Sequence, residues 1–151
     1  MVDRILIDTN ILLYAYDRGA PIKQPRAVAT LDRLVRAGRG VITPQVLAEF
    51  YVNATRKLEP PLEREEAYET IQNYLASWEV LAITGQIVLE AARGVHTYQL
   101  SYWDAQIWAT ARLYQIPVIL SEDSNTGAVL EGVRFVDPFA EEFDLETWLL
   151  A

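Results

Sequence analysis

Residues 6–16, LIDTNILLYAY, place an aspartate between two apolar segments. The residues before Asp8 alternate as in a short strand, whereas the apolar residues from Ile11 to Tyr16 recur at helical spacing. We therefore predict that the chain changes from strand to helix at Asp8. A carboxylate at such a junction serves either as the cap of the helix or as a ligand. Taken alone, Asp8 is consistent with both roles.

The rest of the chain repeats this alternation of strand and helix. Further strands are predicted at residues 40–43, 79–84, 116–123 and 133–139. Further helices are predicted at residues 25–40, 45–58, 64–78, 85–100 and 101–115, with Thr43 as a cap and Pro44 opening the second of them. A short helical turn is expected before residue 133. Because this alternation requires crossover connections, the sequence predicts an α/β fold with a largely parallel sheet covered on both faces.

Length and composition limit what the chain can be. With 151 residues, of which 51% are hydrophobic, the chain is large enough for one buried core. Cysteine is absent, which excludes disulfides, thiolate metal sites and a catalytic thiol. No apolar run approaches the ~20 residues that a membrane span needs. We therefore expect one domain and a cytoplasmic location.

The charge is unevenly distributed. The net charge is −8, yet residues 1–60 carry nine of the 13 basic side chains and only six of the 21 acids. Binding of phosphate groups normally relies on lysine and arginine. The basic half therefore offers candidate phosphate-binding residues, although solvated helix faces explain the same pattern. These candidates are Arg18, Lys23, Arg26, Arg56 and Lys57.

Four acids are candidate metal ligands: Asp8, Glu49, Asp104 and Asp123. Asp104 follows Ser101 in an S-x-x-D pattern that equally describes a helix capping box. Asp123 follows a strand, where a turn would accept aspartate without any function. Glu49 differs, because it lies inside a helix among apolar neighbours and needs a partner there. No Lys or Arg stands three or four residues from it, and Asn53 offers only a hydrogen bond.

The four acids together suggest a metal site. Asp8 and Asp123 each follow a strand, and ligands bind at the carboxyl ends of strands in sheets of this kind. If four carboxylates came within ~5 Å of each other, each ionised pair would cost roughly 3 kcal/mol, and several pairs would rival the stability of a whole domain. Such a cluster must take up protons or bind a cation, and oxygen ligands favour Mg²⁺ or Mn²⁺.

Four segments carry a resemblance to a known family. They are LIDTNILLYAYD (6–17), TPQVLAEFYVNATRKL (43–58), SYWDAQIWATARLYQIPVILSEDS (101–124) and GVRFVDPF (132–139). Together they resemble a prokaryotic PIN-domain protein of the VapC toxin type, from about Arg4 to Pro138. The resemblance implies a three-layer α/β/α sandwich, formed by a single PIN domain over residues 1–151. It also implies a metal-dependent ribonuclease that is silenced by a small antitoxin and is a homodimer.

The resemblance also assigns roles to individual residues. The acidic quartet, catalytic and metal-binding, falls on Asp8, Glu49, Asp104 and Asp123. Hydroxyl groups that order the site fall on Thr9 and Ser121, and supporting amides on Asn10 and Asn53. Glu122 is a less favoured ligand beside Asp123. The implied reaction uses one or two Mg²⁺ or Mn²⁺ ions to hydrolyse RNA to 5′-phosphate and 3′-hydroxyl ends, with the basic residues holding flanking phosphates.

Other mechanisms and classes lack their residues. The chain has no Cys, and its one His, His96, falls in a predicted surface helix, so Ser-His or two-histidine ribonuclease chemistry lacks its parts. A receiver-like module would need a late lysine, and residues 58–151 contain none. A phosphatase of the haloacid dehalogenase type would need a D-x-D motif after the first strand, but the third residue there is Asn10. A dinucleotide-binding fold would need a Gly-rich turn after the first strand, and this turn contains no Gly.

One alternative from another class stays open at this point. It is a catalytically silent PIN-fold interaction module that would use Trp103, Trp108, Trp148 and the tyrosines as a binding surface, although most of these aromatics are expected in the core.

Overall fold

Six short strands form one sheet in the computed structural model, which describes residues 3–123 and 125–149. They are β1 (Ile5–Ile7), β2 (Gly40–Ile42), β3 (Glu79–Val80), β4 (Val118–Leu120), β5 (Val129–Leu130) and β6 (Val133–Val136). The strand order is β3-β2-β1-β4-β6-β5, and all neighbours are parallel except β5 and β6. Every residue of β1 and β4 is buried, as expected for central parallel strands.

Seven helices connect or cover these strands within the described residues. They are α1 (Thr9–Ala15), α2 (Lys23–Ala37), α3 (Pro44–Ala54), α4 (Arg64–Ser77), α5 (Gly85–Tyr98), α6 (Tyr102–Leu113) and α7 (Leu145–Leu149). Hydroxyl caps define several starts. Thr43 Oγ1 accepts a hydrogen bond from Val46 N, with Pro44 at the first helical position, so the predicted start of α3 is confirmed.

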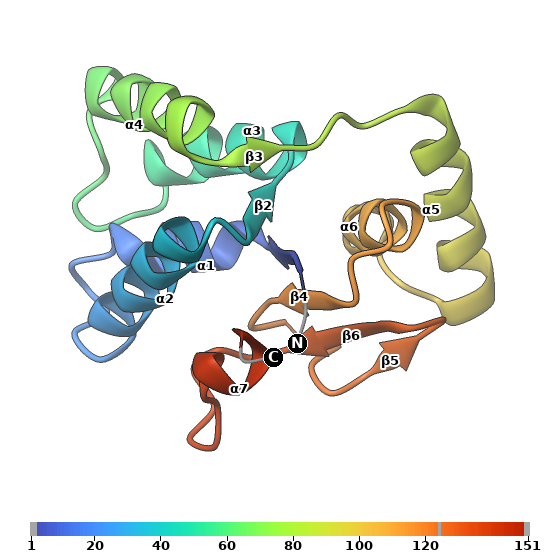
Figure 1. Ribbon diagram of the computed structural model, residues 1–151. Coiled ribbons are helices and arrows are strands. Elements are labelled where there is room, and N and C mark those ends of the chain that lie inside the picture. The colour runs from blue at the N-terminus through green and yellow to red at the C-terminus, as the bar shows by residue number, and fades with distance from the viewer. Residues whose placement is uncertain (1–2, 124, 150–151) are drawn as a thin grey trace.

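The helices lie on both sides of the sheet (Figure 1). The chain runs outward from β1 through β2 to β3 and then returns to β4 on the other side of β1. Because crossovers are right-handed, this reversal puts α5 and α6, which lead from β3 to β4, on the opposite face from the helices before β3. Accordingly α1, α2 and α4 lie to one side, and α5 and α6 to the other. The predicted three-layer α/β/α arrangement with a mostly parallel sheet is confirmed.

The reversal of direction places a topological switch point between β1 and β4. The connections that follow β1 and precede β4 lie on opposite faces of the sheet. The chain therefore leaves a space open beyond the carboxyl ends of these two strands. Ligands of open α/β sheets bind at such a point, outside the carboxyl ends of the strands. Asp8 directly follows β1, and Ser121 directly follows β4. The fold therefore brings these two segments together although 113 positions separate the two residues.

Several bounds and one strand differ from the sequence prediction. The helix predicted over residues 45–58 ends at Ala54, and the strand predicted over 79–84 pairs only over Glu79–Val80. The turn expected after Asp123 is present at residues 125–127, but the antiparallel strand β5 that follows was not predicted. A two-residue hairpin turn joins β5 to β6, with φ of 50° at Glu131 and 84° at Gly132.

Glu131 is a poor residue for a positive φ, and its surroundings compensate. The Glu131 carboxylate accepts hydrogen bonds from Arg93 (2.7 Å), Tyr98 (2.6 Å) and Arg112 (3.2 Å). These donors come from α5 and α6, so side chains distant in sequence hold the hairpin turn in place. A strand of two residues followed by such a turn leaves almost no periodic signal, which explains why β5 was missed.

Close packing of α5 against α6 depends on Gly94. Trp108, on α6, is fully buried, and its indole Nε1 donates to Leu130 O at 3.1 Å. A Cβ atom at Gly94 would lie 2.7 Å from Cζ3 of Trp108, well inside van der Waals contact. The absence of a side chain at Gly94 therefore permits the approach of the two helices on this face of the sheet.

Replacing Gly94 by alanine is expected to destabilise the protein. Overpacking against Trp108 should lower the free energy of unfolding by about 1–3 kcal/mol. The higher helix propensity of alanine offsets up to about 1 kcal/mol of this loss. We expect a net loss of about 1–2 kcal/mol in the free energy of unfolding, measured by urea denaturation. Gly85→Ala in the same helix is the control, because its Cβ would meet nothing within 4 Å. Equal stability of the two variants would contradict this packing.

Candidate metal centre

Asp8 joins the end of β1 to the start of α1. Its Oδ1 accepts from Thr9 N at 2.7 Å, and its backbone N donates to Leu120 O at 3.0 Å. Its Oδ2 accepts from Ser121 Oγ at 2.8 Å. The carboxylate is only 9% exposed. Asp8 therefore caps α1 and also faces the segment after β4, so the two roles considered from the sequence coexist.

Three carboxylates meet at this edge of the sheet. One oxygen from each of Asp8, Asp104 and Asp123 lies within 4.8 Å of the other two. Asp104 stands in the first turn of α6, where its backbone N donates to Ser101 Oγ at 3.3 Å. The cap at Ser101 thus fixes the turn that presents Asp104. Capping and site formation again involve the same residues.

One oxygen of Asp123 has no partner among the residues that the structure describes. Its Oδ1 accepts from Asn125 N at 2.8 Å, whereas Oδ2 is buried and finds no hydrogen-bond donor among the described residues. A buried carboxylate oxygen without a donor is costly and calls for an unseen partner. Since the three carboxylates offer only oxygen ligands, a hard divalent cation such as Mg²⁺ or Mn²⁺ fits the site.

The electrostatics of the cluster agree with this interpretation. Burial raises the pKa of Asp8 from 3.8 to about 6, the charges of Asp123 and Asp104 add to the rise, and hydrogen bonds from Ser121 and Thr9 oppose it. The pKa of Asp104 is also raised, first by burial and then by the charge of Asp123. The folded chain therefore concentrates negative charge that a cation would neutralise.

Glu49, the fourth predicted acid, is not part of this group of three. It is half-buried on α3, and its Oε1 accepts from Gln45 Nε2 at 2.7 Å. Gln45 Nε2 also donates to Trp103 O at 3.2 Å, and Gln106 Nε2 donates to Gln45 Oε1 at 2.8 Å. Gln45 thus ties Glu49 to the first turn of α6, next to Asp104.

Gln45 is a site residue that the sequence prediction missed. The sequence offers Asn53 as a hydrogen-bonding partner of Glu49, but Gln45 also stands four residues before Glu49 on the same helix face. A glutamine in the first turn of an otherwise apolar helix was the available signal. Asn53 lies one turn after Glu49, near the end of α3.

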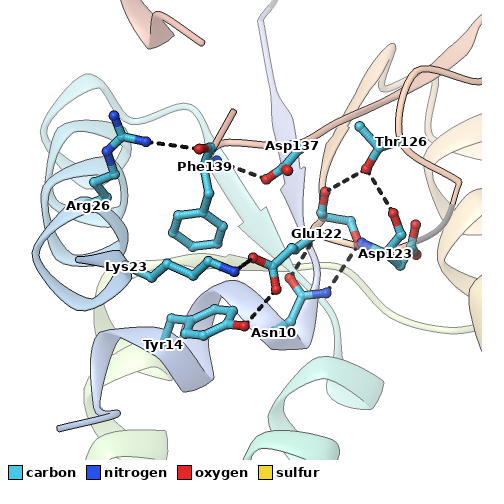
Figure 2. A network of polar contacts seen from close by, with 10 residues as sticks. Asn10, Tyr14, Lys23, Arg26, Glu122, Asp123, Thr126, Asp137 and Phe139 are labelled. Atoms are coloured by element: carbon cyan, nitrogen blue, oxygen red, sulfur yellow. Dashed lines mark hydrogen bonds and ion pairs between the residues drawn. The ribbon is translucent and has the colours of Figure 1, made fainter. Parts of the chain in front are cut away.

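The Ser121 side chain links Asp8, Asn10 and Asp123. Its Oγ donates to Asp8 and accepts from Asn10 Nδ2 and Asp123 N, both at 3.3 Å. Asn10 Oδ1 in turn accepts from Glu122 N at 3.3 Å (Figure 2). These contacts fix the segment after β4 against the start of α1.

Two further polar groups border the cluster. Thr9 Oγ1 is buried, and no partner for it is found among the described residues. Asn125, which the sequence prediction did not include, donates from Nδ2 to Asp104 Oδ2 at 3.3 Å. Its spacing of two residues after Asp123 is typical of a turn in which an aspartate accepts from the backbone, and this pattern was the available signal.

The side chain of Glu122 points away from Asp123, one of the three carboxylates (Figure 2). Its Oε1 accepts from Tyr14 Oη at 2.6 Å, and its Oε2 pairs with Lys23 Nζ. Lys23, predicted to bind phosphate, therefore has an acidic partner within the protein. Arg26, predicted for the same role, donates to Phe139 O at 2.9 Å.

The other basic candidates and His96 lie on the surface. Arg18, Arg56 and Lys57 are exposed, and none forms an ion pair with the described part of the chain. His96 is exposed in the last turn of α5, outside the cluster. Among the tryptophans considered as a binding surface, Trp108 is buried, Trp148 is partly buried and only Trp103 is mostly exposed.

Comparison with known proteins identifies the family. A profile of the PIN domain matches residues 5–129, which is most of the chain. The chain belongs to the PIN-domain family. The family predicted from the sequence is confirmed, while no curated protein sequence matches significantly.

Solved structures show the same fold. A toxin-antitoxin complex from Klebsiella pneumoniae matches with a TM-score of 0.66 and 21% identity, over 89% of this PIN domain chain and 97% of that one. VapC20 of Mycobacterium tuberculosis, a sarcin-ricin loop cleaving toxin, matches with a TM-score of 0.64 and 18% identity, over 80% of this chain and 91% of that one. DNA-bound VapBC from Salmonella typhimurium matches with a TM-score of 0.64 and 16% identity, over 91% of this chain and 99% of that one. At these identities the likeness establishes the fold.

None of the helices described in this PIN domain is long and apolar enough to cross a membrane.

The metal-free PIN domain is expected to lose stability as Asp8 ionises. Because the pKa of Asp8 is about 6 in the folded chain and 3.8 ordinarily, the stability that protonation contributes is fully present below pH ~4 and lost above pH ~6. In EDTA, the free energy of unfolding should therefore fall by roughly 3 kcal/mol between pH 4 and 7, relative to Asp8→Asn.

Urea denaturation of both proteins across this pH range measures the difference. Parallel pH profiles for wild type and Asp8→Asn would contradict the assigned burial of Asp8. Addition of Mn²⁺ at pH 7 should stabilise the wild type and leave the variant nearly unchanged, because bound cation replaces the missing proton.

Proposed function

We propose that this PIN domain is a metal-dependent endoribonuclease and the toxin of a toxin-antitoxin pair. The observation that supports this most strongly is the convergence of Asp8, Asp104 and Asp123 within 4.8 Å, with Asp123 Oδ2 buried and lacking a donor among the described residues. Paired carboxylates that hold divalent cations are a recurrent solution for phosphodiester hydrolysis. No thiol is present, and the single histidine lies outside the cluster, so nucleophilic alternatives lack their residues.

The metal would be one or two Mg²⁺ or Mn²⁺ ions held by Asp8, Asp104 and Asp123, with Glu49 as the fourth acid. When bound, such ions lower the pKa of water and stabilise charge on phosphoryl oxygens. The chain's own residues orient the ligands. Ser121 holds Asp8 by a 2.8 Å hydrogen bond, and Asn125 holds Asp104. Gln45 holds the Glu49 carboxylate toward the start of α6.

RNA is the proposed substrate, cleaved to 5′-phosphate and 3′-hydroxyl ends. The bound cations would offset the repulsion between the acidic cluster and the phosphate backbone. Arg18, Arg56 and Lys57 are exposed and remain candidates for flanking phosphates. Arg26 and Lys23 are weaker candidates, because both already engage acceptors within the protein.

The proposed partners are a small VapB-like antitoxin and a second copy of the chain. The Klebsiella pneumoniae and Salmonella typhimurium neighbours are toxin-antitoxin assemblies, and the Mycobacterium tuberculosis neighbour cleaves the sarcin-ricin loop. These relatives support an antitoxin-controlled ribonuclease. We further propose that the protein acts as one PIN domain over residues 1–151, in the cytoplasm, where its RNA substrate resides.

Removal of a clustered carboxylate is expected to abolish RNA cleavage. Loss of the outer partners of metal ligands costs about 10–100-fold, so loss of a ligand itself should cost about 100-fold or more. Asp8→Asn and Asp104→Asn are therefore expected to lower the cleavage rate by at least this factor, with Mg²⁺ or Mn²⁺ present. Cleavage of a defined RNA, followed on a denaturing gel with mapped ends, provides the measurement.

Two controls make the result specific. Asp32→Asn, which removes an exposed acid paired with Arg36 on α2, should cleave as fast as wild type. EDTA should stop wild-type cleavage, and Mg²⁺ or Mn²⁺ should restore it. Cleavage by Asp8→Asn or Asp104→Asn at the wild-type rate would disprove the assignment. A wild type that cleaves no RNA in either metal would instead favour a catalytically silent interaction module.

A further inference from the structure

The segment after β4 is attached to α1 and α2 through Glu122. Glu122 Oε1 accepts from Tyr14 Oη at 2.6 Å, and Glu122 Oε2 pairs with Lys23 Nζ. Tyr14 lies on α1, and Lys23 is the first residue of α2. We name these three residues the Glu122 clamp. Figure 2 shows the side chain of Glu122 reaching toward both helices, away from Asp123.

The ammonium group of Lys23 contacts two aromatic rings as well as its acidic partner. Lys23 Nζ lies 5.0 Å from the ring centroid of Tyr14 and 5.5 Å from that of Phe139, within range of cation-π attraction. The two rings pack edge to face with centroids 5.0 Å apart. Arg26 donates to Phe139 O, and Phe139 N donates to Asp137 Oδ1. The position of the Lys23 ammonium group is therefore fixed by contacts within the protein, whereas a phosphate-binding lysine needs an ammonium group that is free to contact RNA.

The clamp acts directly beside the metal centre. Glu122 lies between Ser121 and Asp123, in the segment that follows β4. Ser121 contacts Asp8, and Asp123 joins the acidic cluster, whereas Glu122 contacts Tyr14 and Lys23. Its backbone N also donates to Asn10 Oδ1. Anchoring the middle residue therefore fixes the orientation of both neighbours.

The clamp also limits the negative charge at the site. Glu122 is a carboxylate that directly precedes Asp123, and Asp123 belongs to the group of three clustered carboxylates. Pairing with Lys23 neutralises Glu122 and keeps it on the far side of the segment. Without Lys23, a flexible acidic side chain would be free to turn toward the cluster and compete for the cation.

We propose that Lys23 and Tyr14 are positioning residues that hold Glu122 outside the acidic cluster and thereby set Ser121 and Asp123 for metal binding. This inference rests on the proposed function, because it assumes that the cluster binds a divalent cation. It replaces the phosphate-binding role that the sequence predicted for Lys23.

The two roles of Lys23 give opposite expectations for Glu122→Gln. If Lys23 binds RNA, this change frees its ammonium group, and RNA binding should tighten or stay the same. If Lys23 acts through Glu122, then Glu122→Gln and Lys23→Met should show the same defect. The double variant should then be no worse than either single variant, because both changes break one ion pair.

The readout is the Mn²⁺ dependence of RNA cleavage, together with direct Mn²⁺ binding followed by electron paramagnetic resonance. We expect Lys23→Met and Glu122→Gln each to raise the half-saturating Mn²⁺ concentration about 10-fold, the lower end of the effect of outer partners of metal ligands. The rate at saturating Mn²⁺ should change less than about twofold. Lys23→Arg, which keeps the charge, should recover most of the Mn²⁺ affinity.

Controls separate positioning from general stability. Asp32→Asn breaks the exposed Arg36–Asp32 pair on α2 by the same acid-to-amide change, and its Mn²⁺ affinity should equal that of wild type. Tyr14→Phe removes one hydroxyl from the clamp and keeps the ring, so it remains testable if Lys23→Met does not fold. Tyr14→Phe should also raise the half-saturating Mn²⁺ concentration, by a smaller factor than Lys23→Met.

Three results would overturn the inference, and they show whether the proposed function fails with it. If wild type binds Mn²⁺ and cleaves RNA while the clamp variants match it in Mn²⁺ affinity, the clamp is wrong and the proposed function stands. The same holds if Lys23→Met raises only the KM for RNA and Glu122→Gln has no effect. If wild type itself binds no Mn²⁺, both the clamp and the proposed function fail.

Discussion

Repulsion between three carboxylates is the constraint on which the site depends. Asp8, Asp104 and Asp123 present oxygens within 4.8 Å of one another, and Asp8 is almost fully buried. No domain gains stability from such an arrangement without protons or a cation. The fold nevertheless enforces it, because β1 and β4 are neighbours at the switch point of the sheet and the first turn of α6 carries the third acid.

The residues that build local structure also build the site. Asp8 caps α1, Ser101 caps the turn that carries Asp104, and Asp123 accepts from the backbone of its own turn. From the sequence these were competing explanations of each acid. In the structure they are complementary, because a cap or turn that fixes the backbone also fixes where the carboxylate points. Ordinary helix and turn chemistry thus supplies the preorganisation that a metal centre requires.

Sequence patterns predicted what depends on periodicity and strand order, and missed what depends on tertiary contact. The parallel sheet and the position of Asp8 followed from strand-helix alternation and from the rule for strand ends. The pairing of Lys23 with Glu122 did not, because 99 positions separate them and a lysine on a helix looks the same whether paired or free. Gln45 was overlooked because a neutral partner for Glu49 gives no charge signal. Strand β5 was too short to show a period.

The central claim is that the three-carboxylate group is a divalent metal site, and a crystal structure of the protein with Mn²⁺ tests it most directly. Anomalous scattering at the manganese edge locates the ion without reference to the protein density. The account predicts an anomalous peak at coordinating distance from oxygens of Asp8, Asp104 and Asp123. Absence of such a peak at saturating Mn²⁺, with the three side chains turned apart, would contradict it.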